Sequence, residues 1–184
     1  SITARAASAI PASRIVGAPA GLPAQPLLAA GQPSEIGSMS ELQDLSSLVR
    51  SNTPLIVIET PDEGRVVDLF RYVLTNVWRA LYRWSITEGL RRVDLDREDP
   101  PETAPDISAA LHAMKSHDQR GIYLLLDAMP YLGYASTQRM LREILERRGS
   151  IEHTVVLVGA KIELPPELEP LAMRFELRLP DEKA

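Results

Sequence analysis

Three short runs of apolar residues place the strongest limit on how this chain can fold. They read LIVIE (55–59), IYLLL (122–126) and TVVLVGA (154–160), and none of them alternates between apolar and polar residues. Unbroken runs rich in β-branched residues are typical of strands buried on both faces of a parallel sheet. We therefore expect a sheet that is covered by helices on both sides.

Segments with the apolar spacing of amphipathic helices separate these runs. The predicted helices are 40–52, capped by Ser40, then 62–83, then a helix capped by Asp106, and 136–149, capped by Ser136. Further strands are expected around Trp84 and Ile86, at RRVDL (91–95) and at 175–179, the last after a short helix near 163–173. This succession predicts an α/β fold with an open, mainly parallel, doubly wound sheet.

The first 37 residues differ in composition from the rest of the chain. They are rich in Ala, Pro and Gly, and prolines at 11, 19, 23, 26 and 33 break any helix. We expect an extended arm over 1–37, which is either a loose tail or a segment that docks on a neighbouring subunit or domain. Residues 38–184 are expected to form one α/β domain.

Composition excludes several classes of function. The net charge of −5 argues against a general nucleic-acid coat, because phosphate binding needs a basic face. The absence of cysteine excludes disulfides, Cys-based zinc sites and thiol nucleophiles, and three histidines are too few for most His-rich metal sites, so no metal site is expected. No apolar run approaches the roughly 18 residues that span a bilayer. A cytoplasmic protein is expected.

Ligands of doubly wound sheets bind beyond the carboxyl ends of the strands, which here are 59–65, 127–134 and 159–165. The first of these segments, ETPDEGR, lies where a phosphate-binding loop would be, and it has one glycine, no lysine and three acidic residues. A working loop needs backbone N–H groups and a lysine to hold phosphates. The acidic residues Glu59, Asp62 and Glu63 would repel a triphosphate, so the usual mode of nucleotide binding is not expected.

Asp127 is the candidate nucleotide-binding residue. An apolar strand that ends in Asp has the form of a Walker B strand, whose Asp holds Mg²⁺, although Ala128 stands where a catalytic Glu is usual. The alternative is a purely structural role, in which Asp127 caps the turn that follows. A phosphoacceptor receiver domain, with Asp127 and Lys161 in its two roles, fits less well, because Glu59 supplies only one of the two acids required. No catalytic residue is predicted.

The aromatic residues Trp78, Tyr82 and Trp84 form a cluster that can be interpreted in two ways. Their spacing favours a place in the core. Alternatively they form a patch that binds a protein partner, because Trp and Tyr are favoured at interfaces.

In their order along the chain, several segments resemble the N-terminal half of a two-lobed AAA+ ATPase family, known as a hypothetical plastid reading frame and also found in bacteria. The matching segments are SELQDLSSLVRSN, PLIVIETPDE, LYRWSITEGL, GIYLLLDAMPYL and TVVLVGAKIELPPELEPLAMRFELRLPD, over about 40–181. The resemblance implies an AAA-like sheet that has lost its phosphate loop. In a full-length relative, an active module that carries the Walker motifs and binds ATP and Mg²⁺ would follow it.

The sequence and the resemblance together predict a non-catalytic, pseudo-ATPase lobe that serves regulation, assembly or partner binding. Its partner would be a protein or the AAA+ module, with a homo-oligomer as a further option. No cofactor is expected for this chain, and no nucleic acid or membrane span. The alternative is a nucleotide-binding or weakly hydrolytic domain that uses Asp127 for Mg²⁺ without a standard phosphate loop.

Overall fold

The computed structural model describes residues 38–97, 99–147 and 151–178. The arm predicted over 1–37 lies outside the described residues, so it stays a prediction. No helix in the described part of the chain has both the length and the apolar character that a membrane crossing requires.

A six-stranded sheet in the order β3-β2-β4-β5-β1-β6 forms the centre of the fold. Its strands are β1 (Leu55–Glu59), β2 (Ala80–Ser85), β3 (Gly89–Arg92), β4 (Gly121–Leu126), β5 (Thr154–Gly159) and β6 (Ala172–Arg174). All neighbouring strands are parallel except β2 and β3, which form an antiparallel hairpin. The predicted open, mainly parallel sheet is confirmed, and the architecture is consistent with an AAA-like fold.

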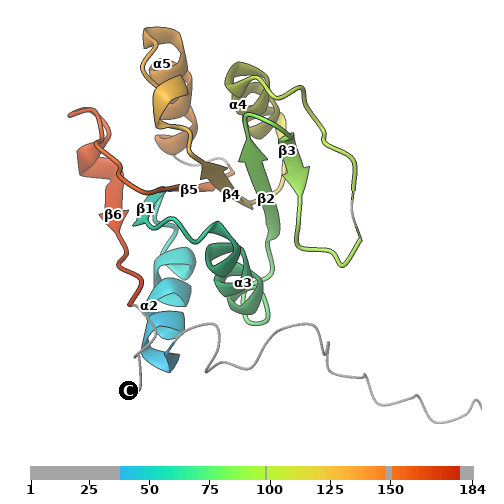
Figure 1. Cartoon of the computed structure of the whole chain (residues 1–184), viewed down its shortest axis with the longest axis vertical. Helices are drawn as coiled ribbons and strands as arrows, with labels where there is room; N and C mark the ends of the chain where they lie inside the picture. The colour runs from blue at the N-terminus through green and yellow to red at the C-terminus, as the bar shows by residue number, and fades with distance from the viewer. Residues whose placement is uncertain (1–37, 98, 148–150, 179–184) are drawn as a thin grey trace, which may run out of the picture.

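In the described part of the chain, four α-helices cover the two faces of this sheet (Figure 1). Helices α2 (Met39–Arg50) and α3 (Glu63–Val73) lie on one face, and α4 (Ile107–Ser116) and α5 (Ala135–Leu145) lie on the other. The core accordingly has two parts, one around Phe70 under α2 and α3 and one around Trp84 under α4 and α5. The central strands β4 and β5 are buried at every position, as their unbroken apolar runs predict.

Two predicted helix caps are wrong and one is confirmed. Helix α2 begins two residues earlier than predicted, because Ser38 rather than Ser40 is its N-cap and forms a capping box with Glu41. Helix α5 has Tyr134 as its N-cap and no side-chain cap, although Ser136 was expected there. Asp106 caps α4 as predicted, since its carboxylate accepts a hydrogen bond from the backbone N–H of Ala109.

The long helix predicted over 62–83 is wrong. Helix α3 ends at Val73, and a turn closed by bonds from Thr75 and Asn76 to the last helical carbonyls leads directly into β2. Apolar residues at 77 and 81 happen to continue the helical spacing although they belong to a loop and a strand. The core position expected for Trp78 is therefore also wrong. Trp78 lies in the loop between α3 and β2, and its side chain is 100% exposed.

The carboxyl-terminal part of the fold differs from the prediction in three places. The predicted helix over 136–149 ends at Leu145. The short helix near 163–173 is a 3₁₀ turn, η2 (Glu169–Leu171). The last strand is β6, at 172–174 rather than 175–179, and it is held by parallel pairing with β1. Consecutive prolines at 165 and 166 and a third at 170 explain why no α-helix forms here.

Candidate functional site

The segments expected to form a site do meet at the carboxyl edge of the sheet. The backbone N–H of Thr60 donates to the carbonyl oxygen of Gly159 at 2.8 Å, and that of Asp127 donates to Val158 at 2.9 Å. These bonds extend the strand pairing by one residue beyond β1 and β4. The loops that begin at 59, 127 and 159 therefore lie side by side.

Asp127 follows β4 directly and has a left-handed backbone, with φ of 49°. Its carboxylate lies over Gly159, where an added Cβ would come within 3.3 Å of Oδ1. The interpretation of Asp127 as a cap for the following turn is wrong, because that 3₁₀ turn, η1 (Met129–Tyr131), has Ala128 as its N-cap and no side-chain cap. The exposed carboxylate is directed instead toward α3.

Glu63, in the first turn of α3, is the residue that meets Asp127. Burial raises the pKa of the Glu63 carboxyl, and the charge of Asp127 and a hydrogen bond with its side chain raise it further, while Arg83 opposes the shift. Two carboxyl groups thus share this edge of the sheet, and one of them holds a proton more readily than an isolated acid. The described residues contain no group of three or more His, Asp, Glu or Cys side chains arranged to hold a metal ion.

Sequence reasoning did not identify Glu63 as the partner of Asp127. Glu63 was interpreted only as one of three acidic residues that would repel a triphosphate. The prediction that 59–65 and 127–134 meet contained the missing signal, because it already places the two carboxyl groups at one edge.

The N-terminus of α3 already carries an acceptor of its own. Oδ1 of Asp62 accepts a hydrogen bond from the backbone N–H of Arg65 at 3.1 Å, and the backbone N–H of Asp62 donates to Oγ1 of Thr60 at 3.1 Å. In a phosphate-binding loop these helix N–H groups would face the ligand. Here a carboxylate occupies that position, with a second carboxylate, that of Glu63, next to it in the chain.

The arginines that neighbour this edge are engaged by carboxylates. Arg174 of β6 pairs with Glu59 at 2.6 Å and also lies 3.5 Å from Glu169. Arg83 of β2 pairs with Glu88 at 2.8 Å. A phosphate would have to displace these partners before either guanidinium could bind it.

The three aromatic residues proposed as a patch do not share a surface. Trp84 is fully buried, and its indole N–H donates to the carbonyl oxygen of Pro105. Tyr82 is 8% exposed and stacks on Tyr123, with ring centres 4.9 Å apart. Trp78 alone of the three can meet a partner, so its partner-binding role stays a prediction and the patch as a whole is wrong.

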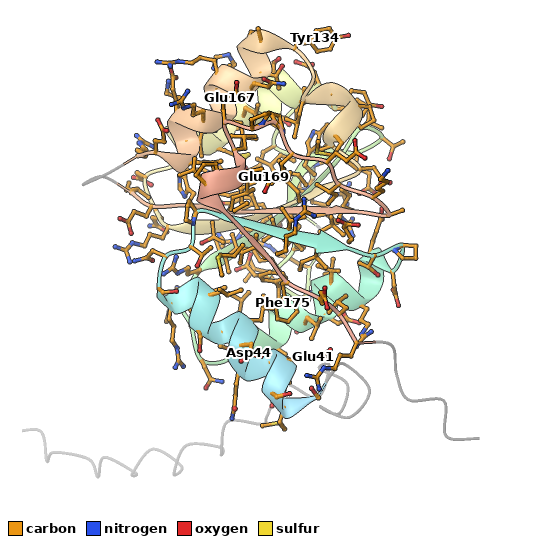
Figure 2. All side chains as sticks on the ribbon, turned by 90° about the vertical axis from the view of Figure 1, so that its left-hand side faces the viewer. Glu41, Asp44, Tyr134, Glu167, Glu169 and Phe175 are labelled. Carbon is orange, nitrogen blue, oxygen red and sulfur yellow. The ribbon has the colours of Figure 1, made fainter. Side chains whose placement is uncertain are left out.

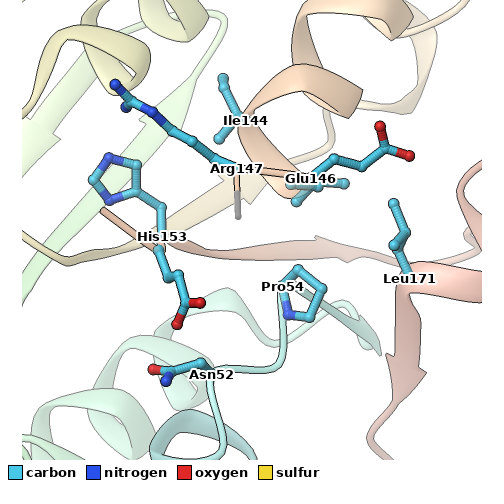
Figure 3. Close-up of a pocket in the computed structure, with 9 residues that line it drawn as sticks. Asn52, Pro54, Ile144, Glu146, Arg147, His153 and Leu171 are labelled. Atoms are coloured by element: carbon cyan, nitrogen blue, oxygen red, sulfur yellow. The ribbon is translucent and has the colours of Figure 1, made fainter. Parts of the chain in front are cut away.

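A hollow of about 500 Å³ lies at the opposite, amino edge of the sheet (Figure 3). It is lined by Asn52, Pro54, Ile144, Leu145, Glu146, Arg147, Glu152, His153 and Leu171. Pro54 and His153 precede β1 and β5, whereas Asp127 follows β4, so the hollow is separate from the carboxyl edge.

Comparison with known proteins decides the family. The family model described as SpoVK-like AAA ATPase, N-terminal domain, matches residues 41–177. The chain belongs to this family. Its β4–Asp127 and β1–α3 junctions are thus parts of the N-terminal domain of a SpoVK-like AAA ATPase, which agrees with the resemblance found in the sequence.

The AAA domain-containing protein ycf46 from two organisms is also similar to this SpoVK-like domain. The protein of Trieres chinensis is 24% identical over 140 residues, which are 76% of this chain and 28% of that protein. The protein of Pyropia yezoensis is 23% identical over 143 residues, 77% of this chain and 29% of that protein. The SpoVK-like domain therefore corresponds to less than a third of the length of these relatives.

Proposed function

We propose that this SpoVK-like domain is a non-catalytic lobe of an AAA ATPase, which serves assembly, regulation or partner binding rather than nucleotide hydrolysis. The observation that carries the proposal is the carboxylate of Asp62 at the N-terminus of α3. It occupies one of the backbone donors, the N–H of Arg65, that a phosphate-binding loop would offer to a nucleotide. ATP and Mg²⁺ would then belong to the module that follows such a domain in a longer relative.

Charge at the carboxyl edge supports the same proposal. A triphosphate seated there would approach Asp62, Glu63 and Asp127, and like charges at short range disfavour binding. The nearby Arg83 and Arg174 do not offset this repulsion, because each already has a carboxylate partner. Binding would require both the helix cap and these ion pairs to be given up.

A second candidate function rests on the carboxyl pair itself. Mg²⁺ is commonly held by one or two carboxylates together with the phosphates of a nucleotide. Glu63 and Asp127 supply two carboxyl groups at the edge where ligands of such sheets bind. On this alternative, Asp127 would hold Mg²⁺ in a weak nucleotide site without a standard phosphate loop.

Calorimetric titration with a non-hydrolysable ATP analogue and Mg²⁺ separates the two candidates. The non-catalytic lobe is expected to show no saturable heat at about 1 mM ligand. At that concentration a site with a Kd of about 1 mM would be half filled. Micromolar binding that disappears in Asp127→Ala would contradict the proposal and favour the second candidate. The matched control is Asp106→Ala, which removes the capping acid of α4, a helix on the opposite face of the sheet from α3.

Trp78 is the proposed contact for a protein partner or for the ATPase module. Its side chain is fully exposed, so Trp78→Ala should weaken such an association without lowering the melting temperature. The matched control is Tyr134→Ala, which removes an aromatic side chain that is 70% exposed at the start of α5. Equal binding by Trp78→Ala and the parent chain would remove Trp78 from the interface.

A further inference from the structure

Glu41 is a buried carboxylate that joins three separate parts of the domain. It lies in the first turn of α2 and only 4% of its surface is exposed. Oε2 accepts a hydrogen bond from the backbone N–H of Ser38 at 3.0 Å and lies 3.6 Å from Nη2 of Arg65 on α3. Oε1 accepts a hydrogen bond from the backbone N–H of Arg178 at 2.6 Å.

The segment that ends at this carboxylate packs on the core through Phe175 and Leu177. We call residues 175–178 the exit segment, since they follow the last strand, β6. The backbone N–H of Phe175 donates to the carbonyl oxygen of Val57 at 2.9 Å, and its ring is buried in the core under α2 and α3. Figure 2 shows this part of the chain running from Glu169 past Phe175 to the end of α2 at which Glu41 lies.

The burial of Glu41 exceeds what a helix cap requires. In a capping box the acid needs to reach only the backbone N–H of the N-cap residue, and it can remain in water. A carboxylate taken out of water is destabilising unless charge-assisted hydrogen bonds satisfy it. Here the additional oxygen, Oε1, accepts the N–H of Arg178, so the second half of the carboxylate is used to hold the exit segment.

We propose that Glu41 is a positioning residue that fixes the path of the chain out of the domain. Ser38 and Arg178 bind the same carboxylate, so the chain enters and leaves the described domain at one point beside the N-terminal end of α2. Building on the proposed function, the part of an AAA ATPase that follows its N-terminal domain would start from this point.

Hydrogen exchange of the 184-residue chain tests the role of Glu41 directly. In Glu41→Ala, the backbone amide of Arg178 in the exit segment should exchange about 10 to 100 times faster, which corresponds to loss of its one charge-assisted hydrogen bond. Amides of β4 and β5 should not change. The control is Asp44→Ala, which removes an exposed acid from the same helix and should leave the exit segment as in the parent chain.

Two results of this experiment would overturn the proposal. One is unchanged exchange of the exit segment in Glu41→Ala, and the other is an equal acceleration of β4 and β5, which would make Glu41 a general stabiliser. Should Glu41→Ala fail to fold, Glu41→Gln provides the test, because it keeps an acceptor for Arg178 but loses the charge. A smaller, still local acceleration is expected for that variant.

Spin labels provide the readout of position, and the chain has no native cysteine to interfere. Labels at Asp44→Cys and Arg178→Cys should give a narrow distance distribution that broadens when Glu41→Ala is added. A control pair at Asp44→Cys and Asp68→Cys, on the exposed faces of α2 and α3, should stay narrow. An Arg178 distance that stays narrow in Glu41→Ala would overturn the proposal. Neither experiment involves nucleotide. Failure of the proposal for Glu41 would therefore not affect the proposed function, which the calorimetric titration tests separately.

Discussion

His153, just before β5, is a buried imidazole whose protonation should weaken the fold in mild acid. Only 3% of its surface is exposed, and it accepts a hydrogen bond at Nδ1 from the backbone N–H of Gly121 at 3.2 Å. Burial lowers the pKa of His153 from 6.5 to about 4, and the neighbouring charges of His117 and Arg147 contribute to the shift, against a smaller opposing effect of nearby backbone. The ring of Tyr123 packs against it edge to face.

The sign and size of the effect follow from this shift. The unfolded chain binds a proton at His153 more readily than the folded chain, so the stabilisation is complete above pH 6.5 and is lost as the pH falls toward 4. Each pKa unit is worth about 1.4 kcal/mol, so the full difference is about 3 kcal/mol. Between pH 7 and pH 4.5 we expect His153 to remove about 2 kcal/mol from the free energy of unfolding.

Urea unfolding of the parent chain and His153→Asn, from pH 7 to pH 4.5, isolates this contribution. The asparagine amide can still accept the N–H of Gly121 but does not titrate, so the stability difference between the two proteins should shrink by about 2 kcal/mol on acidification. The control is His112→Asn, which removes an exposed imidazole on α4. A stability difference for His153→Asn that is independent of pH, or that grows in acid, would refute the reasoning.

Four substitutions test the packing and the helix cap by thermal or urea unfolding. Trp84→Ala should cost about 3–5 kcal/mol because the indole is fully buried, whereas Trp78→Ala should stay within about 0.5 kcal/mol; similar costs would contradict their placement. Gly89→Ala should cost about 1–3 kcal/mol, because φ is +80° and a Cβ would meet the carbonyl oxygen of Thr103; a neutral result would place Gly89 elsewhere. Asp62→Ala should cost about 1 kcal/mol as a lost cap and should not create nucleotide binding; a gain of binding would show that Asp62 alone excludes phosphate.

The sheet could be predicted because its signal is local. The runs at 55–59, 122–126 and 154–160 are buried on both faces except at their last positions Glu59 and Ala160, so burial itself appears in the sequence as an unbroken apolar run. The boundary between α3 and β2 could not be predicted in the same way. The apolar residues at 77 and 81 keep a helical spacing, and only the tertiary pairing of β2 with β4 shows that 80–85 is a strand.

The site was predictable at the level of segments but not of side-chain pairs. Strand order brings the loops after β1, β4 and β5 together, and the sequence already indicated these three junctions. Which acid meets Asp127 depends on the position of α3 over the sheet, and no periodicity encodes it. Glu41 and Arg178 illustrate the same limit, because they lie 137 positions apart and meet only through the packing of β6 and the exit segment.

Residue-resolved NMR of the chain during titration with ATP and Mg²⁺ tests the proposed absence of a nucleotide site most directly. We expect no saturable shift for the backbone amides of Thr60, Asp62, Arg65, Asp127 and Gly159 at ligand concentrations of about 1 mM. Saturable shifts confined to these amides would contradict this expectation, and their loss in Asp127→Ala would show that the carboxyl edge holds a nucleotide.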